Sequence, residues 1–73
     1  MGNLPQYKQM YETLRGQIAS GEFRPGDLLP SEHDLCRQYR LARPTVRKAL
    51  DQLVADGFIV KHQGKGSIVK GAP

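Results

Sequence analysis

Two arginines four residues apart, Arg43 and Arg47, carry the clearest potential chemistry in this 73-residue chain. Each guanidinium group can donate two parallel hydrogen bonds to a planar pair of acceptors, such as the O6 and N7 atoms of guanine. Because four residues make about one turn of an α-helix, both groups can reach into one groove of a duplex. Thr45, between them, can hydrogen-bond a phosphate or a base edge. This segment is therefore a candidate surface for binding nucleic acid.

A second candidate is the segment Gln63-Gly64-Lys65-Gly66, which places one cation between two glycines. Glycine has no Cβ, so such a tip is slim, and its amides can approach a phosphate or enter a minor groove. Taken alone, a tight turn with a solubilising lysine explains the segment better. Its interpretation as a binding segment therefore depends on the elements that surround it.

Apolar residues recur at the helical period in residues 7–18 and again in residues 46–54, which predicts two amphipathic helices. Between them lies a shorter helix, with Ser31 as its N-cap and Asp34 in the place of a capping-box acid. It ends near residues 39–40, so only a tight turn separates it from the last helix. Pro44 suits the first turn of that helix.

Gly57 is a natural residue to end the last helix, and two β-rich segments follow it, residues 58–62 and 67–70. Leu28-Leu29 is long enough only for a bridge or a very short strand. Two helices joined by a short turn form a helix-turn-helix, and a hairpin after it forms a wing. The expected fold is mainly α with a small β-hairpin: a winged helix-turn-helix of three helices plus a wing.

The net charge of +4 is unevenly distributed along the chain. Residues 1–36 carry three cationic and five anionic side chains, a net −2, whereas residues 37–73 carry eight and two, a net +6. A strongly basic half indicates a polyanionic partner, although a solvated basic face would give the same composition.

Several classes of protein are excluded by composition. No apolar run approaches the roughly 20 residues that span a bilayer, and no signal peptide is visible at the start. One cysteine, Cys36, makes no internal disulfide, so the cytoplasm is the expected compartment, and a small buried thiol is its expected state. With two histidines it falls short of a zinc site. No catalytic constellation is present, so the chain is not expected to be an enzyme.

The sequence resembles the N-terminal domain of the GntR family of bacterial transcription regulators. The resemblance rests on the segments Ile18-Ala19-Ser20-Gly21, Pro25-Gly26-Asp27, Leu29-Pro30-Ser31-Glu32, Arg43-Pro44-Thr45-Val46-Arg47 and Gln63-Gly64-Lys65-Gly66-Ser67, together with Leu35, Ala49, Leu50, Leu53, Gly57 and Val69. It covers the chain from about Tyr7 to Val69 with spacings kept. The glycine-rich hairpin is most similar to the HutC-type branch.

The resemblance implies sequence-specific binding of a palindromic double-stranded DNA operator by a homodimer, as part of a ligand-responsive regulator that we expect to be a repressor. The last helix would enter the major groove and the wing the adjacent minor groove. The predicted DNA-binding residues are Ser31, His33, Arg43, Pro44, Thr45, Arg47, Lys48, Gln63, Gly64, Lys65 and Gly66. His33 stands where the family usually has arginine, and Ala42 where it usually has a capping serine, so anchoring at these two positions is expected to be weaker or pH-sensitive.

The resemblance also implies a division into an N-terminal tail (residues 1–6), a DNA-binding domain (7–70) and the start of a linker (71–73). A C-terminal effector-binding and dimerisation domain would follow. No cofactor is expected in this part of the protein, and the small-molecule effector belongs to the absent domain.

Two alternatives remain open from the sequence. A winged helix can serve protein–protein contact, although such domains usually lack a basic outer face on the last helix. The chain can also be the N-terminal part of a fusion with a pyridoxal-phosphate enzyme-like domain, which some family members carry.

Overall fold

The computed structural model describes residues 5–71, which form three helices and one hairpin. The helices are α1 (Gln6–Ala19), α2 (Glu32–Tyr39) and α3 (Arg43–Ala55), and the strands are β1 (Ile59–His62) and β2 (Gly66–Val69). This order confirms the predicted fold. The predicted tail begins before the described residues and the predicted linker ends beyond them, so residues 1–4 and 72–73 lie outside the structural description.

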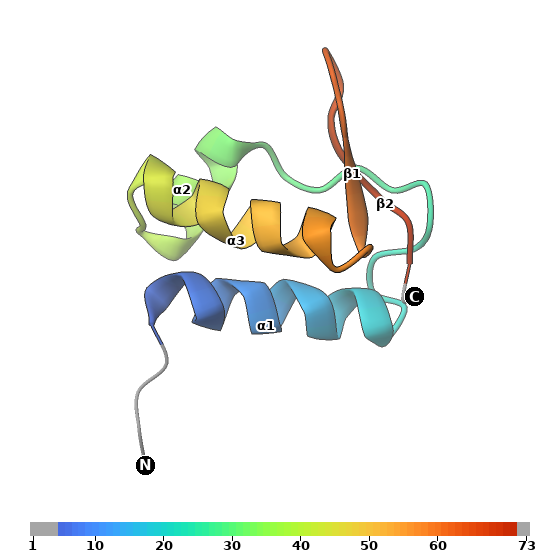
Figure 1. Cartoon of the computed structure of the whole chain (residues 1–73), viewed down its shortest axis with the longest axis horizontal. Helices are drawn as coiled ribbons and strands as arrows, with labels where there is room; N and C mark the ends of the chain where they lie inside the picture. The colour runs from blue at the N-terminus through green and yellow to red at the C-terminus, as the bar shows by residue number, and fades with distance from the viewer. Residues whose placement is uncertain (1–4, 72–73) are drawn as a thin grey trace.

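The helix α1 lies alongside α3, and α2 packs on the other side of α3 (Figure 1). The β1–β2 hairpin leaves the C-terminal end of α3 and projects away from α1 (Figure 1). The tip of the hairpin therefore extends well beyond the helical body, as a wing requires.

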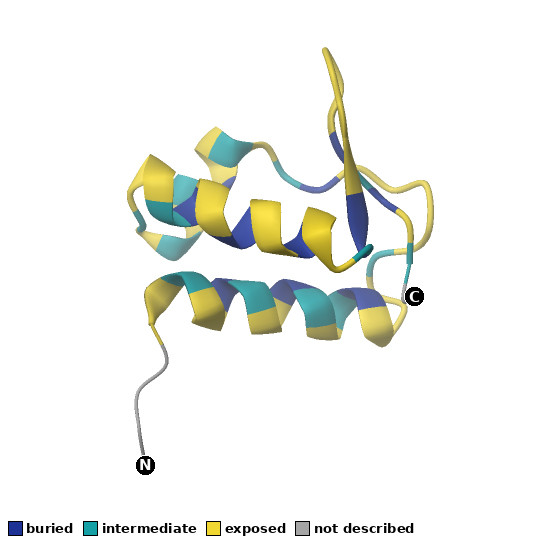
Figure 2. Ribbon diagram, in the orientation of Figure 1, coloured by how far each residue is buried: buried dark blue, intermediate teal, exposed yellow. Residues whose placement is uncertain are grey.

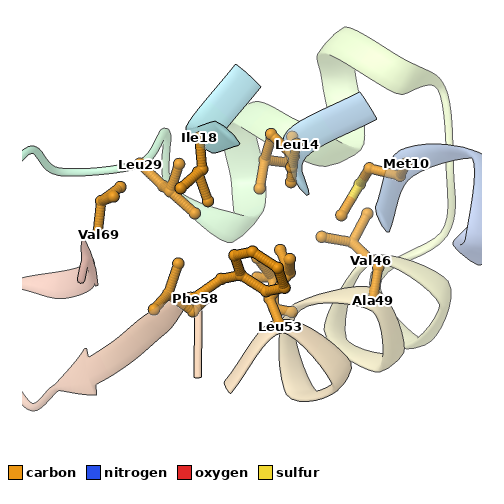
Figure 3. Packing of buried hydrophobic residues seen from close by; sticks show 12 residues of the cluster. Met10, Leu14, Ile18, Leu29, Val46, Ala49, Leu53, Phe58 and Val69 are labelled. Atoms are coloured by element: carbon orange, nitrogen blue, oxygen red, sulfur yellow. The ribbon is translucent and has the colours of Figure 1, made fainter. Parts of the chain in front are cut away.

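One core joins these elements, built from apolar side chains of all three helices and the base of the hairpin (Figure 3). Its members are Met10, Leu14, Ile18, Leu29, Leu35, Val46, Ala49, Leu50, Leu53, Phe58, Ile59 and Val69. Two sequence expectations are wrong in degree. Cys36 is only partly buried, and Val54, within the predicted amphipathic helix of residues 46–54, is 37% exposed.

Local sequence signals set the start and the end of α2 close to the expected residues. Ser31 Oγ accepts a hydrogen bond from the Asp34 amide at 3.0 Å and so caps α2. The reciprocal bond of a capping box, from the Ser31 amide to the Asp34 carboxylate, does not occur among the hydrogen bonds of residues 5–71. Arg40 ends α2 in the left-handed conformation at φ 56°.

The hairpin pairs Ile59 with Val69 and His62 with Gly66 in an antiparallel register. Leu28 forms a bridge to Ile68, which confirms the short extended piece and gives the base of the hairpin a third strand segment. The first strand is one residue shorter than predicted, because Phe58 precedes the first paired position. The second strand lies one residue earlier than predicted, because Gly66 already pairs with His62.

Candidate nucleic-acid interface

The outer face of α3 is exposed along its length, while the opposite face is buried (Figure 2). Val46, Ala49, Leu50 and Leu53 are the buried residues of the helix. The 100° step per residue consequently turns the intervening polar side chains outward. They line a shallow surface depression of about 490 Å³, formed by Arg43, Pro44, Arg47, Lys48, Asp51 and Gln52.

Four predicted site residues are thus placed on one outward surface by α3: Arg43, Pro44, Arg47 and Lys48. Thr45 lies at the edge of this surface and is partly buried. Ala42 is the N-cap residue, and it supplies no side-chain hydrogen bond to the helix. Pro44 has no amide proton, and the Thr45 and Val46 amides both donate to the Ala42 carbonyl at 3.1 Å. Among the backbone hydrogen bonds of residues 5–71, the Arg43 amide is therefore the one first-turn donor that remains available to an anion.

A carboxylate that sequence reasoning missed connects the two arginines. Arg47 Nη2 lies 3.2 Å and Arg47 Nε 3.4 Å from the Glu32 carboxylate, while Arg43 Nε lies 3.6 Å from Glu32 Oε1. The hydrogen-bonded carboxylate raises the pKa of Arg47 above its ordinary value. The sequence signalled Glu32 only as an acid in the first turn of α2.

The start of α2 adds two further predicted residues beside α3. Ser31 uses its hydroxyl oxygen to cap the helix, and its proton remains available as a donor. His33 is exposed on the first turn. A groove of about 430 Å³ separates this end of α2 from the wing, and its wall includes Leu50.

The wing carries the remaining predicted residues in its loop, Gln63, Gly64 and Lys65, and at the first position of β2, Gly66. Both glycines have positive φ, +83° at Gly64 and +100° at Gly66, which L-residues adopt with strain. The Lys65 amide donates to the His62 carbonyl at 2.9 Å and closes the turn. The side chain of Lys65 is exposed at the tip, so the structure brings a cation to the end of the projection.

A second missed contact braces the wing against α3. Lys61 Nζ, on the third residue of β1, lies 2.9 Å from Asp51 Oδ1 on the outer face of α3. Both side chains are about half exposed or more, so the pair orients the hairpin more than it stabilises the fold.

Lys48 differs from the other predicted cations because its ammonium group lies over an aromatic ring. Its Nζ atom is 4.3 Å from the centre of the Tyr7 ring on α1. This is the geometry of a cation–π contact. Lys48 is therefore directed toward α1 in the free protein, although it still lines the outer depression of α3.

A tyrosine–aspartate hydrogen bond joins the same two helices at the other end of α3. The Tyr11 hydroxyl donates to Asp56 Oδ2, and Gln52 Nε2 donates to Oδ1 of the same carboxylate at 3.1 Å. The bond to the carboxylate raises the pKa of Tyr11 to about 12 and lowers the pKa of Asp56. Tyr11 thus links α1 to the C-cap residue of α3.

The described part of the chain contains no group of three or more His, Cys, Asp or Glu side chains placed to hold a metal ion. Within the same residues, no helix combines the length and the apolar character needed to cross a membrane. The chemistry that the structure does assemble is basic and directed outward.

Comparison with known proteins places the chain among its relatives. The family described as "Bacterial regulatory proteins, gntR family" matches residues 6–69. The mannosyl-D-glycerate transport/metabolism system repressor MngR of Escherichia coli (strain K12) is 46% identical over 70 residues, which are 96% of this chain and 29% of that protein. A probable fructoselysine utilization operon transcriptional repressor of the same strain is 42% identical over 64 residues, 88% of this chain and 26% of the relative.

Solved structures agree in fold. The structure of AraR(DBD) in complex with operator ORE1 superposes with a TM-score of 0.88 at 35% identity, over 94% of this chain and 88% of that one. The chain spans somewhat more than a quarter of the length of the two curated relatives.

Proposed function

Since the chain belongs to the GntR family of bacterial regulatory proteins, we propose that it is the sequence-specific, double-stranded DNA-binding domain of a transcription regulator. The observation that carries this proposal is the pair of exposed guanidinium groups one turn apart at the start of α3, beside a projecting wing with a lysine at its tip. The helix and the wing together fit a partner with two adjacent grooves, such as duplex DNA.

In the proposed complex α3 enters the major groove with its N-terminal turn leading. Arg43 and Arg47 donate to the O6 and N7 atoms of guanine bases, and Thr45 contacts a phosphate or base edge. The wing lies over the adjacent minor groove, where the slim Gly64–Gly66 tip brings Lys65 close to the backbone. Phosphate contacts set the register, while the arginines read the sequence.

The two competing functions are less favoured. A protein-binding winged helix does not require the arginines at the start of α3, and several similar solved structures are complexes with operators. An enzymatic role is disfavoured because the family is one of regulatory proteins and the relatives are named as repressors.

For the whole protein we propose a cytoplasmic repressor that binds a palindromic operator as a homodimer. The effector-binding and dimerisation domain would follow residue 73, and a small-molecule effector would bind there. A pyridoxal-phosphate enzyme-like domain in that place is the alternative, and sequence beyond Pro73 decides between them.

Selection from a random duplex library tests the proposed function. We expect one short motif to be enriched, and its affinity to exceed that of a scrambled duplex of equal composition in a fluorescence-anisotropy titration. Two inverted copies of the motif, tested at successive spacings, should bind best at one spacing if two chains bind together. Equal affinity for selected and scrambled duplexes would refute sequence-specific binding.

The same preparation tests the state of the isolated domain. Without a dimerisation domain it is expected to be mainly monomeric in dilute solution, which sedimentation measures directly. A tight dimer in the absence of DNA would contradict this expectation.

A further inference from the structure

The Glu32 carboxylate lies between the two arginines that the proposed function assigns to base contacts, and it is less accessible than either. Its side chain is 27% exposed, against 62% for Arg43 and 58% for Arg47. The anion thus lies behind the guanidinium groups. It can hold them from α2 while their outer edges face solvent.

The atoms involved leave a donor edge free on each arginine. Arg43 turns its Nε atom toward Glu32, so both of its terminal nitrogens remain free to donate to another partner. Arg47 uses Nε and Nη2, and one N–H of Nη2 and both of Nη1 point elsewhere. Since end-on recognition of guanine needs the two terminal nitrogens, the carboxylate contact is compatible with base contact by both residues.

The same carboxylate changes the charge that DNA meets. Two guanidinium groups and one carboxylate give the cluster a net charge of +1 instead of +2. Binding to random duplexes depends on phosphate neutralisation, whereas discrimination depends on where the donors are held. Cancelling one charge weakens binding to random duplexes. Fixing the guanidinium groups before binding lowers the entropic cost of placing the donors that discriminate between sequences.

From this geometry we propose that Glu32 is a positioning residue that sets the sequence selectivity of the α3 surface. It holds Arg43 and Arg47 with their end-on edges outward and suppresses binding to unrelated duplexes. This inference rests on the proposed function, since it assumes that the α3 surface meets duplex DNA.

The chain offers matched variants for the test. E32Q keeps the shape of the side chain and removes its charge. E32D keeps the charge but is one methylene shorter, so it reaches the two arginines less well. D34N removes the same charge from the same first turn of α2, at an acid that forms no ion pair among residues 5–71, and so controls for net charge and for the helix dipole.

The measurement is the dissociation constant for the library-selected duplex and for its scrambled counterpart, at salt concentrations from about 50 to 200 mM. We expect E32Q to bind the scrambled duplex more tightly and to lower the ratio of selected to scrambled affinity about fivefold, the scale of two exposed ion pairs. Its salt slope on scrambled duplex should steepen by up to about one. D34N should change both affinities alike and leave the ratio unchanged.

E32D separates position from charge. It should weaken binding to the selected duplex without any gain on the scrambled one. An unchanged ratio in both E32Q and E32D, or an equal change of the ratio in D34N, would overturn the role of Glu32. If the unmodified protein itself shows no preference for the selected duplex, the proposed function fails instead, so the two failures are distinguishable.

Discussion

The start of α3 and the tip of the wing both present exposed cations, but they are built differently. At the start of α3, Arg43 and Arg47 stand on a helix whose inner face is buried, and they contact Glu32 of a second helix. At the tip, Lys65 stands on a loop between two glycines of positive φ, and its side chain forms no ion pair among the described residues. At the start of α3 the side chains are held in place by an ion pair, whereas at the wing tip the glycines determine the backbone conformation.

This difference suggests a division of labour within one interface. Side chains held in place suit the recognition of base edges, where a displacement of a donor costs the bond. A backbone shaped by glycines, with one exposed cation, suits contact with phosphates, which are the same at every sequence. The following predictions test that division.

The largest expected effect is on selectivity at α3. Arg47→Ala should weaken binding to the selected duplex by about tenfold to a hundredfold and relax base preference at one position. Anisotropy titrations with single-base variants of the duplex measure both changes. Arg15→Ala, which removes an arginine from α1, is the control and should leave the preference intact. Loss of affinity for all sequences alike would remove the distinction between the two surfaces.

The backbone of the wing should be next in sensitivity. Gly66→Ala places a Cβ at φ +100° and should cost about 1 to 2 kcal/mol of stability, with weaker binding to every duplex. Gly16→Ala, inside α1 with nothing within 4 Å of the added carbon, should instead stabilise the protein slightly. Thermal unfolding of both variants decides, and equal Tm values would contradict a wing shaped by its glycines.

Lys65→Ala should have a smaller and more uniform effect. We expect a few-fold loss of affinity for selected and scrambled duplexes alike, with the salt slope reduced by about one. Lys8→Ala removes the same charge from α1 and should change the slope less. A loss confined to the selected duplex would mean that the wing also reads sequence.

The smallest effect should lie away from both surfaces, at the Tyr11–Asp56 hydrogen bond. Tyr11→Phe should lower the free energy of unfolding by less than about 1 kcal/mol, since the hydrogen bond that it removes is exposed to solvent, and it should leave DNA affinity unchanged. Tyr39→Phe is the control, because the hydroxyl of Tyr39 has no hydrogen bond among residues 5–71.

The pH dependence of this bond has a defined sign. The lowered pKa of Asp56 means that its contribution is present above the ordinary value of 3.8 and is lost as pH falls through the lower folded value. The pKa of Tyr11 is raised to about 12, so its contribution is full below the ordinary value of 10.0 and is lost as pH rises through the folded one. The difference in Tm between wild type and Tyr11→Phe should therefore shrink at both extremes.

Much of the fold follows from local signals, and part of the site does not. The helical spacing of Val46, Leu50 and Leu53 predicts which face of α3 is exposed, and Gly64 and Gly66 predict the turn of the wing. Glu32 lies 11 and 15 residues before the arginines it contacts, and only the way α2 packs on α3 brings them together. The Lys48–Tyr7 contact likewise depends on α1 lying alongside α3, so no local pattern predicts it.

The bridge between Leu28 and Ile68 has a mechanical consequence. Only Leu29 and Pro30 separate Leu28 from Ser31, which caps α2, and Glu32 comes next in the chain. Because this connection is so short, we expect a tilt of the hairpin to shift the start of α2, and with it the Glu32 carboxylate that contacts the two arginines.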